Sequence, residues 1–340
     1  MIDPSLPLID LHRHLDGNVR LQTIIDLAEK NGISLPAENV DSLRPYVVVN
    51  DSEPGLMAFI ARFKYLTSIL VDGDACRRVA YENVEDAARE GIDYVELRFS
   101  PWFMASSHGL NPAIVLEAIV DGVAAGARDT GVKVQLIGIL SRTYGVETAF
   151  KELAALLQFK QYFAALDLAG DEAAFPAGLF TEHFRRARDA GLAITVHAGE
   201  SDGPESIWSS INDLGASRIG HGVSAAQDPA LMDYLLERQI GLEISLTSNI
   251  HTQTIDRLEN HPAKSFFERG MLASLNTDDP AISGIDLIHE YQQAAPAAGL
   301  TAAMTRQSQL NAVQMAFLSV SDKQALMDKK RPPPSRRGPS

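Results

Sequence analysis

Hydrophobic and polar positions along the chain alternate between two kinds of segment. Short apolar runs rich in β-branched residues are each followed by a longer Ala- and Leu-rich stretch with a helical period. The short runs predict strands at Leu6–His14, Ile92–Ser100, Val132–Leu140, Phe163–Gly170, Ala193–Ala198, Arg218–Val223, Gly241–Leu246 and Met271–Thr277. The longer stretches predict helices near 74–90, 112–130, 146–160, 178–190, 204–214, 228–238, 261–269 and 286–298.

Strands that are apolar almost throughout and alternate with helices are typical of a parallel sheet covered on both faces. Eight such repeats favour a closed barrel over a doubly wound open sheet. The predicted fold class is therefore α/β, a (β/α)8 TIM barrel. Glycines at the ends of five helices are expected to adopt left-handed caps before the next strand, namely Gly91, Gly131, Gly191, Gly215 and Gly241.

The connection between the first two strands is too long for an ordinary loop. Residues 18–73 predict two or three extra helices inserted after strand one, on the face of a barrel where insertions often act as lids. Aromatic and aliphatic side chains are frequent here, including Phe59, Phe63, Tyr65 and Leu66. They are compatible both with ordinary helix packing and with an apolar gate over a pocket.

The chain is predicted to form one domain over residues 1–328, since its 340 residues suit a single α/β barrel. Residues 329–340 read KKRPPPSRRGPS and have no apolar side chain other than proline. This segment predicts a disordered, Pro/Arg-rich tail.

The net charge of −14 argues against binding to phosphate backbones or to an anionic membrane surface, so neither nucleic acid nor membrane is an expected partner. No apolar run is long enough to span a membrane, and the first residues lack a signal-peptide pattern, so a cytoplasmic location is expected. The one cysteine, Cys76, is expected to be a small buried hydrophobic residue. A monomer and a dimer are both compatible with the sequence.

Polar residues concentrate at the ends of four predicted strands. In a TIM barrel the active site is built where the strands end. Four of the nine histidines lie there with a series of carboxylates, in the strings HRHLDG (12–17), HAGE (197–200), GHG (220–222) and NTDDP (276–280). A single His-x-His pair is weak evidence, whereas this combined placement is strong evidence for a site.

The spacing of these residues predicts a metal centre. His12 and His14 are two residues apart on a strand, so both point into the barrel mouth while Arg13 points outward. His197 supplies a third nitrogen and Asp278 a carboxylate oxygen. Three histidines and one aspartate suit one zinc ion per chain, with a position left for water.

Three further groups are candidate catalytic residues. Glu200 lies three residues after His197 and is placed to deliver a proton to a ring nitrogen. His221 and Asp279 are expected to align the attacking water and to take its proton. For Asp279, which precedes Pro280, an alternative is a role as a helix N-cap. Structural roles are expected for the remaining histidines, His108, His183, His251, His261 and His289.

These strings, together with DLAGDE (167–172), IGHG (219–222) and TSN (247–249), resemble those of the adenosine deaminases in the metal-dependent amidohydrolase superfamily. The resemblance extends from residue 1 to about residue 328 and is close to bacterial members. It implies zinc binding by His12, His14, His197 and Asp278, and protonation of purine N1 by Glu200. It also implies that His221 and Asp279 position and deprotonate the hydroxide.

The same resemblance implies a substrate-binding set. Gly170 would donate its backbone amide to purine N3, and glycine there lets the base approach closely. Asp16 would meet a ribose hydroxyl, and His14 and Asp279 would also border the substrate. The implied reaction is the hydrolytic deamination of adenosine and 2′-deoxyadenosine to inosine and 2′-deoxyinosine plus ammonia, a step of purine salvage, with the nucleoside and water as partners.

Three alternatives are weaker. A deaminase of free adenine or of another 6-aminopurine is disfavoured by Asp16, because adenine-specific relatives resemble HLEG rather than HLDG. A binuclear amidohydrolase is disfavoured because no lysine lies at a predicted strand end. A barrel that only binds a metal or a purine would not need Glu200, His221 and Asp279. The deaminases with a Pro-Cys-x-x-Cys signature are excluded by the single cysteine.

Overall fold

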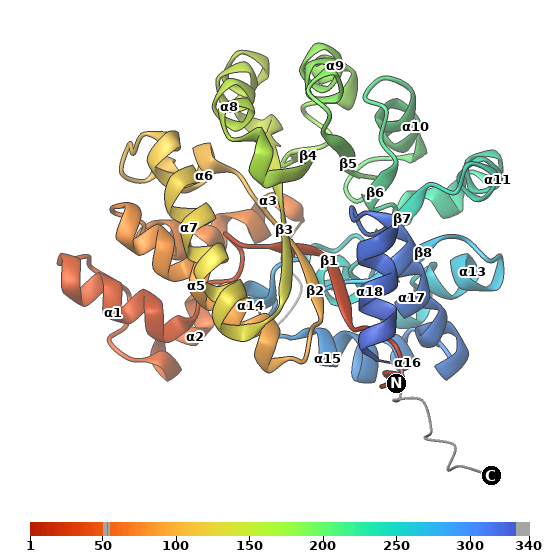
Figure 1. The fold of residues 1–340 in the computed structure, drawn as a ribbon, viewed down its shortest axis with the longest axis horizontal. Helices are drawn as coiled ribbons and strands as arrows, with labels where there is room; N and C mark the ends of the chain where they lie inside the picture. Colours follow the sequence, from red (N-terminus) through yellow and green to blue (C-terminus); the bar gives the residue numbers. More distant parts are fainter. Residues whose placement is uncertain (50–52, 54, 331–340) are drawn as a thin grey trace, which may run out of the picture.

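The computed structural model describes residues 1–49, 53 and 55–330. Eight parallel strands pair in chain order, and helices surround them (Figure 1). The strands are β1 (Ile9–His14), β2 (Tyr94–Phe99), β3 (Lys133–Ser141), β4 (Phe163–Ala169), β5 (Ala193–Ala198), β6 (Arg218–His221), β7 (Gly241–Ile244) and β8 (Ala273–Leu275). All eight predicted strands and the (β/α)8 barrel are confirmed.

Seven helices lie between consecutive strands at the predicted positions, and one more helix of this set follows β8. They are α5 (Gly73–Arg89), α7 (Pro112–Thr130), α8 (Val146–Gln158), α9 (Thr181–Asp189), α10 (Pro204–Asn212), α11 (Pro229–Arg238), α13 (Ala263–Glu268) and α17 (Ala302–Met315). Short helices also occur in the loops and after β8, namely α6 (Pro101–Ser106), α12 (Leu246–His251), α14 (Pro280–Ser283), α15 (Leu287–His289) and α16 (Ala295–Ala297). The predicted helix at 286–298 is interrupted, with a π-helical turn at Glu290–Ala294 between α15 and α16.

The sequence pattern missed α17 and the last helix, α18 (Val320–Lys329). The pattern missed α17 because much of the buried face of this helix is polar. Ser308 accepts a hydrogen bond from the amide of Leu275 (2.9 Å), and Asn311 donates to the carbonyl of Ala273 (2.8 Å). Because these side chains pair with the backbone of the barrel, α17 packs against it without an apolar stripe.

The barrel closes through a small number of bonds between β1 and the segment after β8. The amide of His14 donates to the carbonyl of Asp278 (2.7 Å), and the amide of Asp278 donates to the carbonyl of His12 (2.8 Å). In the same segment, the side chain of Asn276, directly after β8, accepts a hydrogen bond from the amide of Leu11 in β1 (2.9 Å). Closure therefore occurs at the end of the barrel where the candidate site residues lie.

Charged side chains fill the middle of the barrel. Arg98 pairs with Asp167 (2.8 Å) and Glu243 (2.7 Å), while Arg218 pairs with Glu243 (2.6 Å) and Glu96 (2.5 Å). All five side chains are buried. Buried charges are costly unless they are paired and hydrogen-bonded, and here each one has at least one partner of opposite charge.

The insertion after β1 contains more and shorter helices than the predicted two or three. Its described part holds α1 (Leu21–Asn31), α2 (Val40–Val47), α3 (Leu56–Ile60) and α4 (Lys64–Thr67), with a 3-10 turn between the last two. Leu66 is buried in the core, whereas Phe59 and Phe63 border a cavity at the barrel mouth. Ordinary helix packing is therefore confirmed for Leu66, whereas a role of Phe59 and Phe63 as an apolar gate stays a prediction.

Four of the five expected glycine caps are present, since Gly91, Gly131, Gly191 and Gly215 have φ angles between 75° and 90°. The prediction for Gly241 is wrong. Gln239 takes the left-handed position after α11, with φ of 54°, and Gly241 instead begins β7. A side chain at Gly241 would overlap Met315 of α17, so this glycine serves helix packing rather than helix termination.

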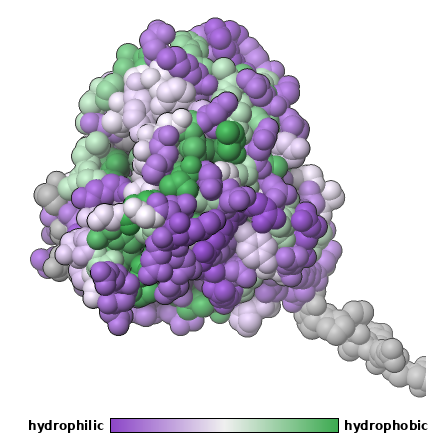
Figure 2. Space-filling model, turned by 90° about the vertical axis from the view of Figure 1, so that its left-hand side faces the viewer, coloured by the Kyte–Doolittle hydropathy of each residue, from purple (hydrophilic) through white to green (hydrophobic). Residues whose placement is uncertain are grey.

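The face that carries α1, α2, α5 and α7 is mostly hydrophilic with separate hydrophobic areas (Figure 2).

Cys76 is buried, as expected, and burial raises the pKa of its thiol to about 12. The predicted tail of residues 329–340 begins too early, because Lys329 is the last residue of α18, and residues 331–340 lie outside the described residues. Among the helices of the described ranges, none has both the length and the apolar character needed to cross a membrane.

Close packing of α5 against α7 depends on Gly122, and this yields a stability prediction. A Cβ at this position would overlap the carbonyl oxygen of Arg77 and lie 2.8 Å from Cβ of Ala80. Gly122→Ala gains up to ~1 kcal/mol of helix propensity, but we expect a net loss of about 1–3 kcal/mol because backbone must move to relieve the overlap. The measurement is the free energy of unfolding in urea.

Gly178→Ala is the matched control, because the nearest atoms to its added Cβ lie at 3.6 and 3.7 Å. It should change the free energy of unfolding little. A Gly122→Ala variant as stable as the unmodified protein would show that the two helices do not depend on this close approach.

A candidate metal centre at the mouth of the barrel

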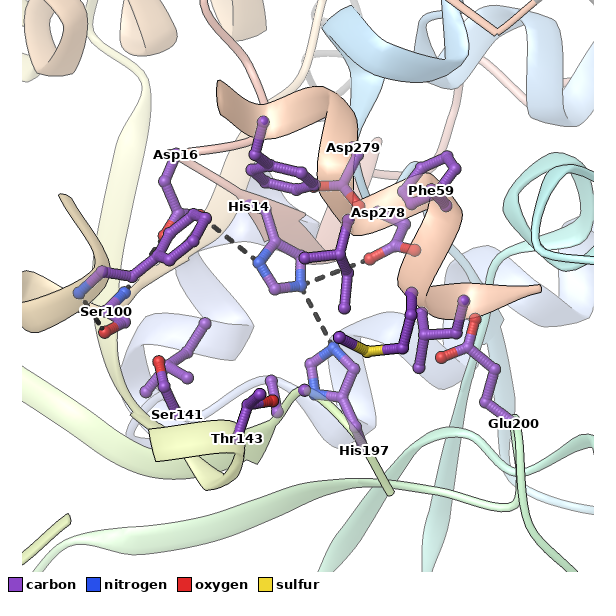
Figure 3. Close-up of a pocket in the computed structure, with 18 of the residues that line it drawn as sticks. His14, Asp16, Phe59, Ser100, Ser141, Thr143, His197, Glu200, Asp278 and Asp279 are labelled. Carbon is purple, nitrogen blue, oxygen red and sulfur yellow. Dashed lines mark hydrogen bonds and ion pairs between the residues drawn. The ribbon is translucent and has the colours of Figure 1, made fainter. Parts of the chain in front are cut away.

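Four side chains converge where the barrel closes. His12 and His14 come from β1, His197 from β5, and Asp278 from the segment after β8. The Nε2 atom of His197 lies 3.1 Å from Nε2 of both His12 and His14. Asp278 Oδ1 lies 3.1 Å from His12 Nε2 and 3.3 Å from His14 Nε2. Three of these side chains, His14, His197 and Asp278, are drawn in Figure 3. The four predicted metal ligands are thus brought together.

The contact between His12 and His197 suits a bound cation. His12 Nδ1 lies 2.8 Å from Glu243, and His197 Nδ1 lies 3.0 Å from Asp167. Carboxylates accept hydrogen bonds, so both rings carry their proton on Nδ1, and their Nε2 lone pairs face each other. Burial lowers the pKa of both rings, that of His197 to about 3, so neither Nε2 gains a proton readily. A metal ion between the lone pairs satisfies this geometry.

Asp278 and its neighbours supply the negative charge that attracts such a cation. Oδ2 of Asp278 accepts a hydrogen bond from Ser248 (2.6 Å), whereas the buried Oδ1 has no hydrogen-bond donor. Although burial opposes it, the carboxylates of Asp279, Asp16 and Asp278 raise the pKa of His14 to about 9. The same field that favours a proton on His14 favours a metal ion beside it.

His221 lies at the edge of this cluster rather than inside it. It follows Gly220 at the end of β6 and has a left-handed backbone, with φ of 63°. Its Nε2 lies 3.6 Å from Glu200 Oε2 and 4.0 Å from Asp278 Oδ2. Although His12, His197, His221 and Asp278 together could also hold a metal ion, the shorter distances of His14 make it the better fourth member. A strained backbone at a site residue is typical of functional sites.

The loop after β5 holds Glu200 over the cluster. Glu172 accepts hydrogen bonds from the amides of Gly199 (2.6 Å), Glu200 (3.2 Å) and Ser201 (2.9 Å), which fixes the turn. The Glu200 carboxylate accepts a further hydrogen bond from Thr252 (3.2 Å). Burial raises the pKa of Glu200 to about 6, and Asp278 and Glu172 add to the shift while His221 opposes it. Glu200 is therefore suited to carry a proton near neutral pH.

Asp279 is buried beside Asp278. Burial and the charge of Asp278 raise the pKa of Asp279 well above its ordinary value. It occupies the N-cap position of α14, but its side chain makes no capping hydrogen bond. Its buried Oδ1 has no hydrogen-bond partner and lies where a side chain at Gly17 would be. The alternative role as a helix cap is therefore not realised, and the carboxylate is free to act in the site.

A cavity of about 200 Å³ opens above these groups. Its floor is polar, and Asp16, Glu200 and Asp279 all face it (Figure 3). One carboxylate oxygen of Asp16 accepts the amide of Ser100 (3.2 Å), and the other lies 3.4 Å from His14 Nδ1. Gly170 lines another side, with a φ of 112° that favours glycine. The wall is apolar and includes Leu56, Met57, Phe59, Ile60, Phe63 and Phe103.

Sequence reasoning missed the residues that hold the site from below. Asp167 and Glu243 orient His197 and His12, and Arg98 bridges these two carboxylates. Arg142, which is fully buried, donates to the carbonyls of Leu168 (3.2 Å) and His197 (2.7 Å) where β4 and β5 diverge. For Arg98, Asp167 and Glu243 the available signal was a charged residue inside an otherwise apolar strand, which a globular core rarely contains without a partner. Arg142 follows β3 and gave no such signal.

Known proteins with similar sequences carry this combination of barrel and site. Residues 7–331 match the adenosine deaminase family. An adenosine deaminase from Edwardsiella ictaluri is 58% identical over 331 residues, which cover 97% of this chain and 99% of the relative. An adenosine deaminase from Klebsiella pneumoniae is also 58% identical, over 329 residues that cover 97% and 99% of the two chains.

Solved structures show the same architecture at lower identity. The adenine deaminase of Arthrobacter aurescens has a TM-score of 0.89 and 26% identity, with coverage of 96% of this chain and 98% of the other. The N6-methyl-AMP deaminase of Arabidopsis thaliana has a TM-score of 0.81 and 26% identity, with 96% of each chain covered. Given the match over nearly its whole length and the identity to the curated relatives, this chain belongs to the adenosine deaminase family.

Proposed function

We propose that this chain hydrolyses adenosine and 2′-deoxyadenosine to inosine and 2′-deoxyinosine with release of ammonia. The observation that carries the proposal is the convergence of His12, His14, His197 and Asp278 on one point, with the protonatable Glu200 facing the same cavity. The relatives named adenosine deaminase, at 56–58% identity, support this substrate.

We infer that the four converging residues hold one zinc ion. Zinc bonds to nitrogen and oxygen are 2.0–2.2 Å long, so adjacent ligand atoms around one such ion lie roughly 2.8–3.6 Å apart. The observed separations of 3.1–3.3 Å fit this arrangement. A zinc ion held there would lower the pKa of a water molecule in its remaining coordination position.

The other residues are proposed to hold the substrate and to move protons. Glu200 donates its proton to purine N1 as water attacks C6, which offsets the charge that develops on the ring. His221 and Asp279 orient the attacking water. The backbone amide of Gly170 is proposed to donate to purine N3, and Asp16, beside His14, to bind a ribose hydroxyl. The apolar wall excludes bulk water from the reacting atoms.

Deamination of adenine is the main alternative, and one similar structure is an adenine deaminase. Asp16 favours the nucleoside, because its carboxylate is held by the amide of Ser100, faces the cavity and is an acceptor for a ribose hydroxyl. A binuclear centre bridged by a lysine is not supported, since no lysine is among the described residues that line the cavity.

The first prediction concerns the substrate and the metal. Purified protein should convert adenosine to inosine, followed by the ultraviolet change, and should act far more slowly on adenine. Chelator treatment should abolish the activity and added zinc should restore it. Turnover of adenine alone would overturn the role of Asp16, and inactivity on both compounds with zinc bound would overturn the proposed function.

The second prediction concerns the residues that orient the ligands. Asp167→Asn should weaken zinc binding about 10- to 100-fold, because the amide no longer offers His197 Nδ1 a full negative charge. Competition with a chelator measures the affinity. Asp121→Asn, which alters an exposed ion pair with Arg77, is the control and should leave zinc binding unchanged. Equal zinc affinity in both variants would contradict the proposed role of Asp167 in orienting His197.

The third prediction concerns Glu200. Glu200→Gln should lower kcat by about 10²- to 10⁴-fold, because the amide cannot deliver a proton to N1. Zinc content should not change. Glu205→Gln, at an exposed position of α10, is the control.

The pH dependence provides a second readout for Glu200. Its pKa is raised to about 6, and it donates only when protonated, so kcat/KM should fall as the pH rises through the pKa of this group. This alkaline decline should be absent from the residual activity of Glu200→Gln. An identical decline in both proteins would assign the titration to another group.

A further inference from the structure

A chain of hydrogen bonds links His221 to His261, a histidine that the sequence pattern assigns to a structural role. His221 Nδ1 lies 3.1 Å from the amide nitrogen Nδ2 of Asn249, in α12. Asn249 Oδ1 lies 3.2 Å from His261 Nε2. His261 Nδ1 in turn accepts a hydrogen bond from the backbone amide of Ala263 (3.0 Å), at the start of α13. The three side chains are buried.

The backbone amide of Ala263 sets the direction of this chain. A backbone N–H can only donate, so His261 Nδ1 must carry a lone pair. Burial lowers the pKa of His261 to about 3, with a smaller contribution from His221, so the ring is neutral. Its one ring proton is therefore on Nε2, from which it donates to Asn249 Oδ1.

The orientation of the Asn249 amide follows. Its oxygen faces the N–H of His261, so its NH₂ group faces His221 and donates to Nδ1. With the amide turned the other way, two N–H groups would oppose each other in a buried site, which costs the energy of an unmade hydrogen bond. His221 Nδ1 is thus an acceptor, and the proton of a neutral His221 ring lies on Nε2, the atom that faces Glu200 and Asp278.

We propose that Asn249 and His261 are positioning residues that fix His221 in its Nε2-protonated tautomer, so that His221 donates a hydrogen bond to the attacking water and Asp279 alone takes the proton. In this step the oxygen of water bonds to C6 while its O–H bond breaks toward a carboxylate oxygen of Asp279, and the electron pair of the C6–N1 π bond moves to N1, which takes the proton of Glu200. The catalytic half of this proposal rests on the proposed function, whereas the tautomer does not.

The arrangement of α12 supports a positioning role. Ser248 donates to Asp278 (2.6 Å), Asn249 to His221 (3.1 Å), and Thr252 to Glu200 (3.2 Å). The helix α12 and Thr252, the residue that caps its C-terminus, therefore contact three groups of the site. The amides of Leu246 and Thr247, at its first turn, donate to the buried carboxylate of Glu290 (3.1 Å each), which anchors the helix.

The direct test is the tautomer of His221. In protein labelled with ¹⁵N-histidine, the nitrogen shifts distinguish a protonated from an unprotonated ring nitrogen, and a His221→Asn variant assigns the signals by their loss. We expect a protonated Nε2 and an unprotonated Nδ1 at His221, and the same pattern at His261. A proton on Nδ1 of His221 would overturn the proposal whether or not the protein deaminates adenosine.

Asn249→Asp tests the catalytic consequence. This nearly isosteric carboxylate cannot donate, so it should move the His221 proton to Nδ1 and leave Nε2 as an acceptor. We expect kcat to fall about 10- to 100-fold, as for other groups that orient site residues, with KM and zinc content little changed. If the His221 proton moves to Nδ1 and kcat is unchanged or higher, His221 acts as the base instead.

The exposed Asn212→Asp, at the end of α10, is the matched control and should alter neither the His221 shifts nor kcat. If Asn249→Asp does not fold, the shifts of His221 in the unmodified protein still decide the tautomer. If neither protein deaminates adenosine but the shifts are as expected, the proposed function fails and the assignment of the tautomer stands.

Discussion

The site depends on how the barrel closes. β1 and the segment after β8 are joined by two backbone hydrogen bonds, and the residues that make them, His12, His14 and Asp278, are also the residues whose side chains converge. Asp278 adopts a left-handed backbone with φ of 67°, a conformation that costs of order 1–3 kcal/mol outside glycine. The closing bonds hold it there, so the fold that joins the ends of the sheet also aims the carboxylate at the two histidines.

A layer of buried charge supports this junction from below. Arg98 connects Asp167 and Glu243, and these two carboxylates orient His197 and His12. Buried ion pairs contribute little net stability, because desolvation cancels much of their attraction. Their effect here is directional, since each imidazole is held with its Nδ1 proton toward the charged layer and its Nε2 lone pair toward the point where the four side chains converge.

The upper side of the site is held by loops rather than by strands. Glu172 fixes the turn that presents Glu200, while α12 and its C-terminal cap residue Thr252 contact three different groups of the site. The cavity between these loops and α3 has an acidic floor and an apolar wall. Such a division suits a substrate with a flat aromatic part and a few polar atoms, for which the polar groups set orientation and the apolar surface excludes water.

The sequence alone determined the barrel and the residues of its mouth, because both follow from local rules. The alternation of apolar runs and helical stretches depends on near neighbours, and parallel strands in a barrel all end on one face, so His12, His14, His197 and Asp278 could be placed together before any distance was known. Only the tertiary structure decided which groups those residues touch. Glu243 lies 231 positions from His12, and the Asn249–His261 pair comes from two segments whose local patterns give no sign of His221. Such contacts depend on strand register, on the bonds that close the barrel and on polar side chains such as those of α17, none of which a local hydrophobic pattern records.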